Sequence, residues 1–298
     1  MTRIAVPAIA FAFAVSCTQS PFRSSPPADS AGSPRERNLE TTVEGDAPDA
    51  SVPAVTPPAA AEPAPLPAAP PPPNGPEPLE VPGFAPASHV GPSGDAAWPR
   101  PVVVVLHGNF DRPEWECDMW AEVASFHGFV LCPRGVRTPW ASLEEDRWTY
   151  KGAARVEAEI EAGLAALEAR YPGRATREGM VLVGFSLGAI LAPALVESSP
   201  GKYAHLFLVE GGIEKLDGKR IALLRRKGVT GVGLAMSAPG RRRLANAAIP
   251  VLHAAGIRAI FVDMKGAGHG YSTDFATTGA AAMHALVGDP AGGQGDQP

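Results

Sequence analysis

The stretch that decides the fold is Gly179-Met-Val-Leu-Val-Gly-Phe-Ser-Leu-Gly-Ala-Ile-Leu-Ala-Pro193. An apolar run rich in Val and Leu reaches Gly184-Phe-Ser-Leu-Gly188, and small residues in a helical pattern follow it. Glycines two residues before and after a serine leave room for the backbone to turn sharply from a strand into a helix. The pattern therefore predicts that Ser186 stands on a strained turn, with its hydroxyl at the carboxyl end of a sheet.

The segments around this turn alternate between strands and helices. Pro101-Val-Val-Val-Val-Leu106 is a β-branched run, as expected of a strand buried on both faces. Further strands are expected at 129–132, 180–183, 205–209, 229–236 and 257–264, and helices at 114–127, 152–171, 187–198, 219–227, 240–255 and 272–287. The apolar side of the first helix is expected at Trp115, Met119, Val123 and Phe126. This alternation predicts an α/β fold, a mainly parallel sheet covered by helices on both faces.

Composition divides the chain sharply. Of its 33 prolines, 21 lie between Cys17 and Pro101, many in runs with alanine. Such a segment buries too little apolar area to offset the entropy of ordering it. We therefore expect a signal peptide at 1–16, a disordered tether at 17–96, one folded domain at 97–288 and a frayed tail at 289–298.

The amino terminus predicts export. Arg3 is followed by an apolar run from Ile4 to Val15, which is too short to span a bilayer and suits a signal peptide. Small residues precede Cys17, so the segment resembles a bacterial lipoprotein signal, which implies that Cys17 carries lipid; an ordinary signal peptidase is the alternative. We expect a periplasmic or cell-surface location, with the membrane as a partner through this anchor.

Charge and cysteines narrow the possibilities further. The formal net charge is −5, and the short basic cluster Arg241-Arg-Arg243 is more typical of a solvated helix face than of a phosphate site. No nucleic-acid partner is expected. Beyond Cys17, the chain holds Cys117 and Cys132, which either form a disulfide in an oxidising compartment or remain two buried thiols.

A serine nucleophile needs a base within hydrogen-bond reach. Among the histidines after Ser186, His269 lies in a glycine-rich loop just past the last expected strand, at the correct end of a parallel sheet. His107-Gly-Asn109 follows the strand at 101–106, where a backbone N–H of Asn109 can join that of Leu187 in an oxyanion hole.

The order strand-His-Gly, strand-Gly-x-Ser-x-Gly, strand-loop-His resembles the α/β-hydrolase superfamily, over about Val102–Val287. The short loops are similar to its dienelactone hydrolase and phospholipase/carboxylesterase branches. The resemblance implies a minimal fold without a large lid, and an acyl-enzyme intermediate on Ser186 with His269 as base. It also implies no cofactor, no metal, and a small-molecule carboxylic ester as substrate.

The resemblance also implies an acidic residue, normally an Asp directly after the strand that ends at Met236. Ser237 stands there instead. Glu210, at the end of the preceding strand, is the favoured replacement; Asp263 in the last strand is a second, and a site without an acid a third.

The segment 133–150 carries Trp140, Trp148 and Tyr150, which either line a substrate pocket or pack over the sheet edge. The leading hypothesis is a serine esterase. The alternatives are a peptidase or acyltransferase using the same site, and a non-catalytic binding module of the same fold at the cell surface.

Overall fold

The computed structural model describes residues 75–93, 98–142 and 144–288. The expected signal peptide, Cys17, most of the expected tether and the expected tail lie outside these residues. None of the helices that the structure describes is long and apolar enough to cross a membrane.

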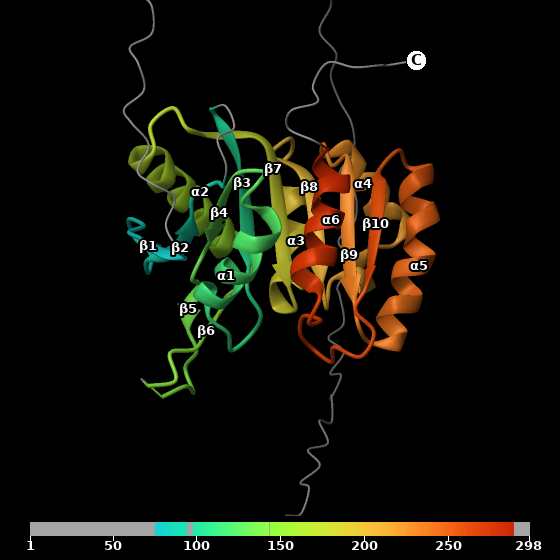
Figure 1. Ribbon diagram of the computed structural model, residues 1–298, viewed down its shortest axis with the longest axis horizontal. Coiled ribbons are helices and arrows are strands. Elements are labelled where there is room, and N and C mark those ends of the chain that lie inside the picture. Colours follow the sequence, from blue (N-terminus) through green and yellow to red (C-terminus); the bar gives the residue numbers. More distant parts are fainter. Residues whose placement is uncertain (1–74, 94–97, 143, 289–298) are drawn as a thin grey trace, which may run out of the picture. The chain divides into compact units, whose positions relative to one another are not determined.

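The domain is built on a sheet of eight strands (Figure 1). They are β1 (Glu77–Leu79), β2 (Ala87–Val90), β3 (Arg100–Leu106), β4 (Phe129–Cys132), β7 (Ala175–Phe185), β8 (Tyr203–Val209), β9 (Gly231–Met236) and β10 (Arg258–Asp263). Their order in the sheet is β1-β2-β4-β3-β7-β8-β9-β10. Strand β2 is antiparallel to both of its neighbours, β1 and β4. Every other pair of neighbouring strands in this order is parallel. The carboxyl ends of the parallel strands therefore share one edge, where ligands bind in sheets of this kind.

Helices cover both faces of the sheet, as predicted. They are α1 (Pro113–Ala124), α2 (Ala153–Arg170), α3 (Leu187–Ser198), α4 (Gly218–Arg226), α5 (Pro239–Ala254) and α6 (Phe275–Val287), with a short 3₁₀ turn η1 (Ile213–Lys215). One apolar core lies under α2 to α5, and a second lies under α1 and α6, which stand in front of the sheet in Figure 1. Successive side chains of a strand point to opposite faces, so Val104 enters the first core and Val105 the second.

The folded region begins earlier than predicted. Residues assigned to the tether form β1 and β2, and β2 pairs with β4 through the register Ser88–Cys132 to Val90–Val130. The prolines around these strands hid them, because proline is compatible with short edge strands but weakens any sequence signal for a strand. The domain therefore starts at or before β1 and not at residue 97.

The buried side of α1 differs from the prediction at one end. Val123 is buried and Met119 and Phe126 pack against the core, as predicted, but Trp115 is 51% exposed. The structure also buries Glu116 and Trp120. A glutamate among the inward positions breaks the apolar periodicity, so the pattern did not indicate that this part of the helix faces the core.

The segment 133–150, which lacks periodicity, contains a small two-stranded sheet of β5 (Val136–Arg137) and β6 (Trp148–Thr149).

Cys117 of α1 and Cys132 of β4 are joined by a disulfide. Of the two alternatives that the sequence left open for these cysteines, the structure has the disulfide, which ties α1 to the sheet.

Candidate active site

Ser186 joins β7 to α3 and occupies the left-handed region of backbone space, with φ 51° and ψ −107°. A residue with a side chain pays about 1–3 kcal/mol for such a conformation, so the surrounding structure must impose it. Its N–H donates to the carbonyl oxygen of Val209 at 2.9 Å, which ties the turn to the end of β8. The predicted strand–turn–helix is confirmed.

The two flanking glycines are required by close backbone packing. A Cβ atom on Gly184 would lie 2.4 Å from the backbone nitrogen of Ala189, and one on Gly188 would lie 2.3 Å from the carbonyl oxygen of Leu106. Neither space can be opened by moving a flexible side chain. The glycines therefore let α3 start directly against β3 and β7, which aims Ser186 outward.

His269 meets Ser186 although 83 positions separate them in the chain. Its Nε2 lies 2.8 Å from Ser186 Oγ, a hydrogen-bonding distance. The loop between β10 and α6 carries His269 and turns on Gly266 and Gly268, both with positive φ. The imidazole is 54% exposed, so the pair is open to solvent. A hydroxyl and a potential base are thus in contact at the sheet edge.

Glu210 lies behind His269. Its side chain is 1% exposed, and its Oε2 is 3.6 Å from His269 Nδ1 and 3.6 Å from a terminal nitrogen of Arg241. The other oxygen, Oε1, accepts a hydrogen bond from the Ser237 backbone N–H. The 3.6 Å separation is longer than a hydrogen bond, which is common for catalytic pairs without substrate. The buried carboxylate faces the imidazole from the side opposite the serine.

Asp263, the other acid that the sequence allowed, points elsewhere. It forms an ion pair with Arg242, its side chain is 44% exposed, and it accepts the Lys265 N–H at 3.0 Å. The Arg242 guanidinium lowers the pKa of Asp263 below its usual value. Of the two carboxylates, the structure brings only Glu210 beside His269.

Ser237 occupies the position where the resemblance implies an acid, and it braces the site instead. Besides donating its N–H to Glu210, it donates its hydroxyl to the carbonyl oxygen of Gly268, the residue before His269. One residue thus contacts both the acid and the base loop. In the sequence, Ser237 stands out only because it lacks the carboxylate that the resemblance implies at this position.

The loop after β3 packs against the start of α3. The Gly188 N–H donates to the carbonyl oxygen of His107 at 3.2 Å, and Asn109 Oδ1 accepts from the Thr149 hydroxyl at 2.7 Å. Leu187 stands in the first turn of α3, where backbone N–H groups have no partner within the helix. The elements that carry Asn109 and Leu187 are therefore adjacent, and their service as oxyanion donors stays a prediction.

The three aromatic residues of 133–150 lie in different environments. Tyr150 is buried beneath the loop after β3: its hydroxyl accepts the His107 N–H at 3.2 Å and donates to the Pro133 carbonyl oxygen at 2.9 Å. Trp148 donates to Asp146 at 3.0 Å, and Trp140 is 71% exposed. Tyr150 thus braces the loop, whereas a pocket role for Trp140 and Trp148 stays a prediction.

A cavity of about 540 Å³ adjoins the site. It is lined by Glu210, Ser237, Ala238, Pro239, Arg241, Arg242, Lys265, Gly266, Gly268 and His269. This cavity lies on the acid side of His269, and the residues that line it come from the segments that follow β8, β9 and β10, including the first turn of α5.

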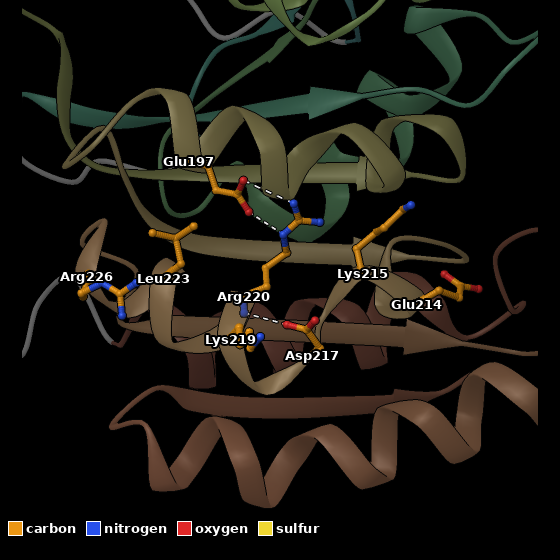
Figure 2. A pocket seen from close by; sticks show the side chains of 8 residues that line it. All are labelled: Glu197, Glu214, Lys215, Asp217, Lys219, Arg220, Leu223 and Arg226. Carbon is orange, nitrogen blue, oxygen red and sulfur yellow. Dashed lines mark hydrogen bonds and ion pairs between the residues drawn. The ribbon is translucent and has the colours of Figure 1, made fainter. Parts of the chain in front are cut away.

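A second cavity, of about 500 Å³, lies among α3, η1 and α4 (Figure 2). Its Arg220 is paired with Glu197, with Nε and Oε1 2.5 Å apart, and Asp217 caps α4 by accepting the Arg220 N–H at 2.8 Å. Figure 2 shows the Arg220 guanidinium reaching Glu197, while Asp217 meets the backbone nitrogen of Arg220. The Arg220–Glu197 pair joins α4 to α3 near the end of α3 opposite Ser186.

A buried polar cluster behind the His269 loop was missed in the sequence. Glu116 of α1 receives a hydrogen bond from the Tyr271 hydroxyl at 2.5 Å, and Trp120 Nε1 donates to that hydroxyl at 3.0 Å. Burial raises the pKa of Glu116 to about 8. In the sequence, Glu116 is the one member of this cluster that could have indicated it, as a glutamate near the apolar side of α1. It was not recognised because the expected apolar side does not include position 116.

Comparison with known proteins supports the fold. No protein-family model matches the chain, and no curated protein does. An uncharacterized protein from Bacillus cereus has a similar structure, with a TM-score of 0.50 and 15% identity over 65% of this chain and 61% of that one. Two further structures are similar at lower TM-scores. The first is a Bacillus cereus carboxylesterase, with a TM-score of 0.43 and 17% identity over 67% of this chain and 95% of that one. The second is Arabidopsis thaliana SOBER1, with a TM-score of 0.43 and 16% identity over 62% of this chain and 99% of that one.

The architecture settles the fold class. The structure matches the expected arrangement. The sheet is parallel except at β2, helices cover both of its faces, and a serine stands on a strand-to-helix turn. The chain has the α/β-hydrolase fold. It spans 61% of the length of the uncharacterized Bacillus cereus protein.

The close backbone packing at Gly188 predicts that alanine is tolerated less well there than at an open glycine position. Gly188→Ala places a methyl group against the Leu106 backbone and should destabilise the fold by about 1–3 kcal/mol or more. Gly240→Ala in α5 is the control, because its Cβ meets open space, and it should be neutral or stabilising by about 0.5–1 kcal/mol. Urea unfolding measures both; equal effects of the two substitutions would contradict the packing argument.

Proposed function

We propose that this chain is a serine hydrolase that cleaves carboxylic esters through an acyl-enzyme intermediate. The observation that carries the proposal is the contact of 2.8 Å between Ser186 Oγ and His269 Nε2, with the buried carboxylate of Glu210 on the far side of the ring. A serine hydroxyl becomes a nucleophile when a base removes its proton, and a carboxylate orients that base.

The reaction would proceed in two halves. Ser186 Oγ attacks the ester carbonyl carbon while His269 takes the hydroxyl proton, and the resulting oxyanion lies against the N–H groups of Leu187 and Asn109. Collapse of this intermediate breaks the bond to the alcohol, which leaves with the proton from His269. Water, deprotonated by His269, then attacks the acyl carbon. Collapse of this second intermediate breaks the bond to Ser186 Oγ, which takes the proton back from His269, and the acid product leaves. Glu210 stabilises the imidazolium in both halves.

Exposure of the site favours hydrolysis over acyl transfer to another molecule. The His269 imidazole is 54% exposed, so water reaches the position from which it would attack the acyl group. An acyltransferase must keep water away from the same intermediate.

We also propose that the chain is exported and anchored by lipid on Cys17. The proposal rests on the apolar run before Cys17 and on the disulfide between Cys117 and Cys132, since disulfides persist in oxidising compartments. The esterase would then act at the periplasmic or cell-surface side of a membrane.

The nucleophile is tested by covalent labelling. A fluorophosphonate probe should label the wild-type protein and leave Ser186→Ala unlabelled, and ester hydrolysis should fall by on the order of 10⁶-fold in that variant. Ser198→Ala, at the other end of α3, is the matched control and should label normally. Absence of labelling in folded wild-type protein would favour a non-catalytic binding module.

The acid is tested by two isosteric substitutions. Glu210→Gln should lower kcat by roughly 10³–10⁴-fold, because the neutral amide no longer stabilises the imidazolium. Asp263→Asn should change kcat by less than about twofold, since that carboxylate faces Arg242. Steady-state hydrolysis of 4-nitrophenyl esters measures kcat of both variants. An equal decrease of kcat in the two variants would contradict the assignment of Glu210 as the acid.

The anchor is tested in a bacterial host. Radiolabelled palmitate should enter the wild-type protein and be absent from Cys17→Ser, because the thiol is the site of attachment. Label that survives the substitution would rule out lipid at this position.

A further inference from the structure

Tyr271 connects the loop that carries His269 to helix α1. It lies two residues after His269, and its hydroxyl donates to Glu116 Oε2 at 2.5 Å. The same hydroxyl accepts a hydrogen bond from Trp120 Nε1 at 3.0 Å. Glu116 and Trp120 are both buried on the inner face of α1, so the loop is held by two polar contacts inside the protein.

The ring of Tyr271 also reaches the nucleophile's turn. It stacks on Phe185, with ring centroids 5.2 Å apart and an angle of 27° between the planes. Phe185 directly precedes Ser186, and its ring is also 5.4 Å from the imidazole of His269. Tyr271 therefore contacts α1 with its hydroxyl and the β7–α3 turn with its ring.

We propose that Tyr271 and Glu116 are positioning residues, whose hydrogen bond holds the His269 loop against α1 and keeps the imidazole within reach of Ser186. This role rests on the proposed function, because it concerns the geometry of the reaction at Ser186. Neither residue touches the reacting atoms.

The chemistry of the pair argues against a role in packing alone. A carboxyl group in an apolar core is less favourable than an apolar side chain of the same size unless a specific partner satisfies it. Glu116 has that partner in Tyr271, and the partner lies in the one loop that carries the base. A Met or Leu at this position would fill the space and leave the Tyr271 hydroxyl without its acceptor.

The charge state of Glu116 adds a pH dependence. Burial raises its pKa to about 8, and the charge of Asp111 adds to the rise, against the opposing effect of the Tyr271 hydrogen bond. Tyr150 and Tyr271 also face this carboxyl, and burial raises the pKa of each well above its usual range, so both stay neutral. Glu116 is therefore mainly protonated at neutral pH.

Ionisation of this carboxyl opposes the folded arrangement. The folded protein retains a proton that the unfolded chain releases near the ordinary carboxyl pKa, so the contribution of Glu116 to stability falls as pH rises from about 4.5 to about 8. Above pH 8, a buried charge is stabilised by admitting water between α1 and the His269 loop. Activity should accordingly decline on the alkaline side.

The test measures kcat and KM for 4-nitrophenyl butyrate across pH 6–10 in five proteins: the wild type, Tyr271→Phe, Glu116→Gln and two controls. Tyr203→Phe removes a buried hydroxyl that has no hydrogen-bond partner among the described residues, near the amino end of β8. Asp118→Asn removes an exposed carboxylate from the same helix as Glu116. The controls therefore match each change in chemistry without touching the Tyr271–Glu116 contact.

Tyr271→Phe should lower kcat by roughly 10- to 100-fold with KM nearly unchanged, since a misplacement of about 1 Å can cost about 100-fold in rate. Glu116→Gln retains a neutral acceptor, so it should keep kcat within about threefold at pH 7 and exceed the wild type at pH 9. Both controls should follow the wild-type profile.

A kcat of Tyr271→Phe equal to that of Tyr203→Phe would overturn the proposal, and so would an alkaline decline that persists in Glu116→Gln. Hydrogen exchange of residues 265–274 distinguishes failure of the positioning role from failure of the proposed esterase function. If the wild type hydrolyses no ester, the esterase proposal fails. Faster exchange in Tyr271→Phe than in Tyr203→Phe still supports the tether between loop and α1, and equal exchange refutes it.

Discussion

The close approach of three backbone segments at Gly184 and Gly188 is the constraint on which the site depends. At these two positions the end of β7, the start of α3 and the end of β3 lie so near one another that no Cβ atom fits. This contact forces Ser186 into a left-handed conformation and brings the loop after β3 beside the first turn of α3. The serine hydroxyl and the candidate oxyanion donors are therefore placed by main-chain packing, which side-chain motion cannot relax.

The remaining groups are delivered to the same edge by the parallel sheet. Glu210 follows β8, Ser237 follows β9 and His269 follows β10, and successive carboxyl ends of parallel strands are neighbours. Polar contacts then lock them together: the Ser237 N–H holds the carboxylate, and its hydroxyl holds the loop before the imidazole. An acid one strand away from the position implied by resemblance still faces His269, because the loop after β10 brings His269 Nδ1 to 3.6 Å from Glu210 Oε2.

A second layer of contacts supports the first from α1. The disulfide fixes that helix to β4, Glu116 and Trp120 bind Tyr271, and Tyr271 stacks on Phe185. Tyr271 thus contacts both the residue before Ser186 and helix α1, and it lies in the same loop as His269. A buried carboxyl that is neutral near pH 7 can take part in such a layer, because it carries no charge to be stabilised by water.

The sequence by itself determined the alternation of strands and helices, the turn at Ser186 and the loop of His269, because these depend on local periodicity and on glycines at fixed spacing. It left three possibilities for the acid, which were Glu210, Asp263 or none. Only the tertiary structure brought Glu210 and not Asp263 beside His269, and only it placed β1 and β2 in the sheet, joined Cys117 to Cys132 and turned Glu116 inward. Each of these depends on which segments meet across long stretches of chain, and local patterns carry no record of such contacts.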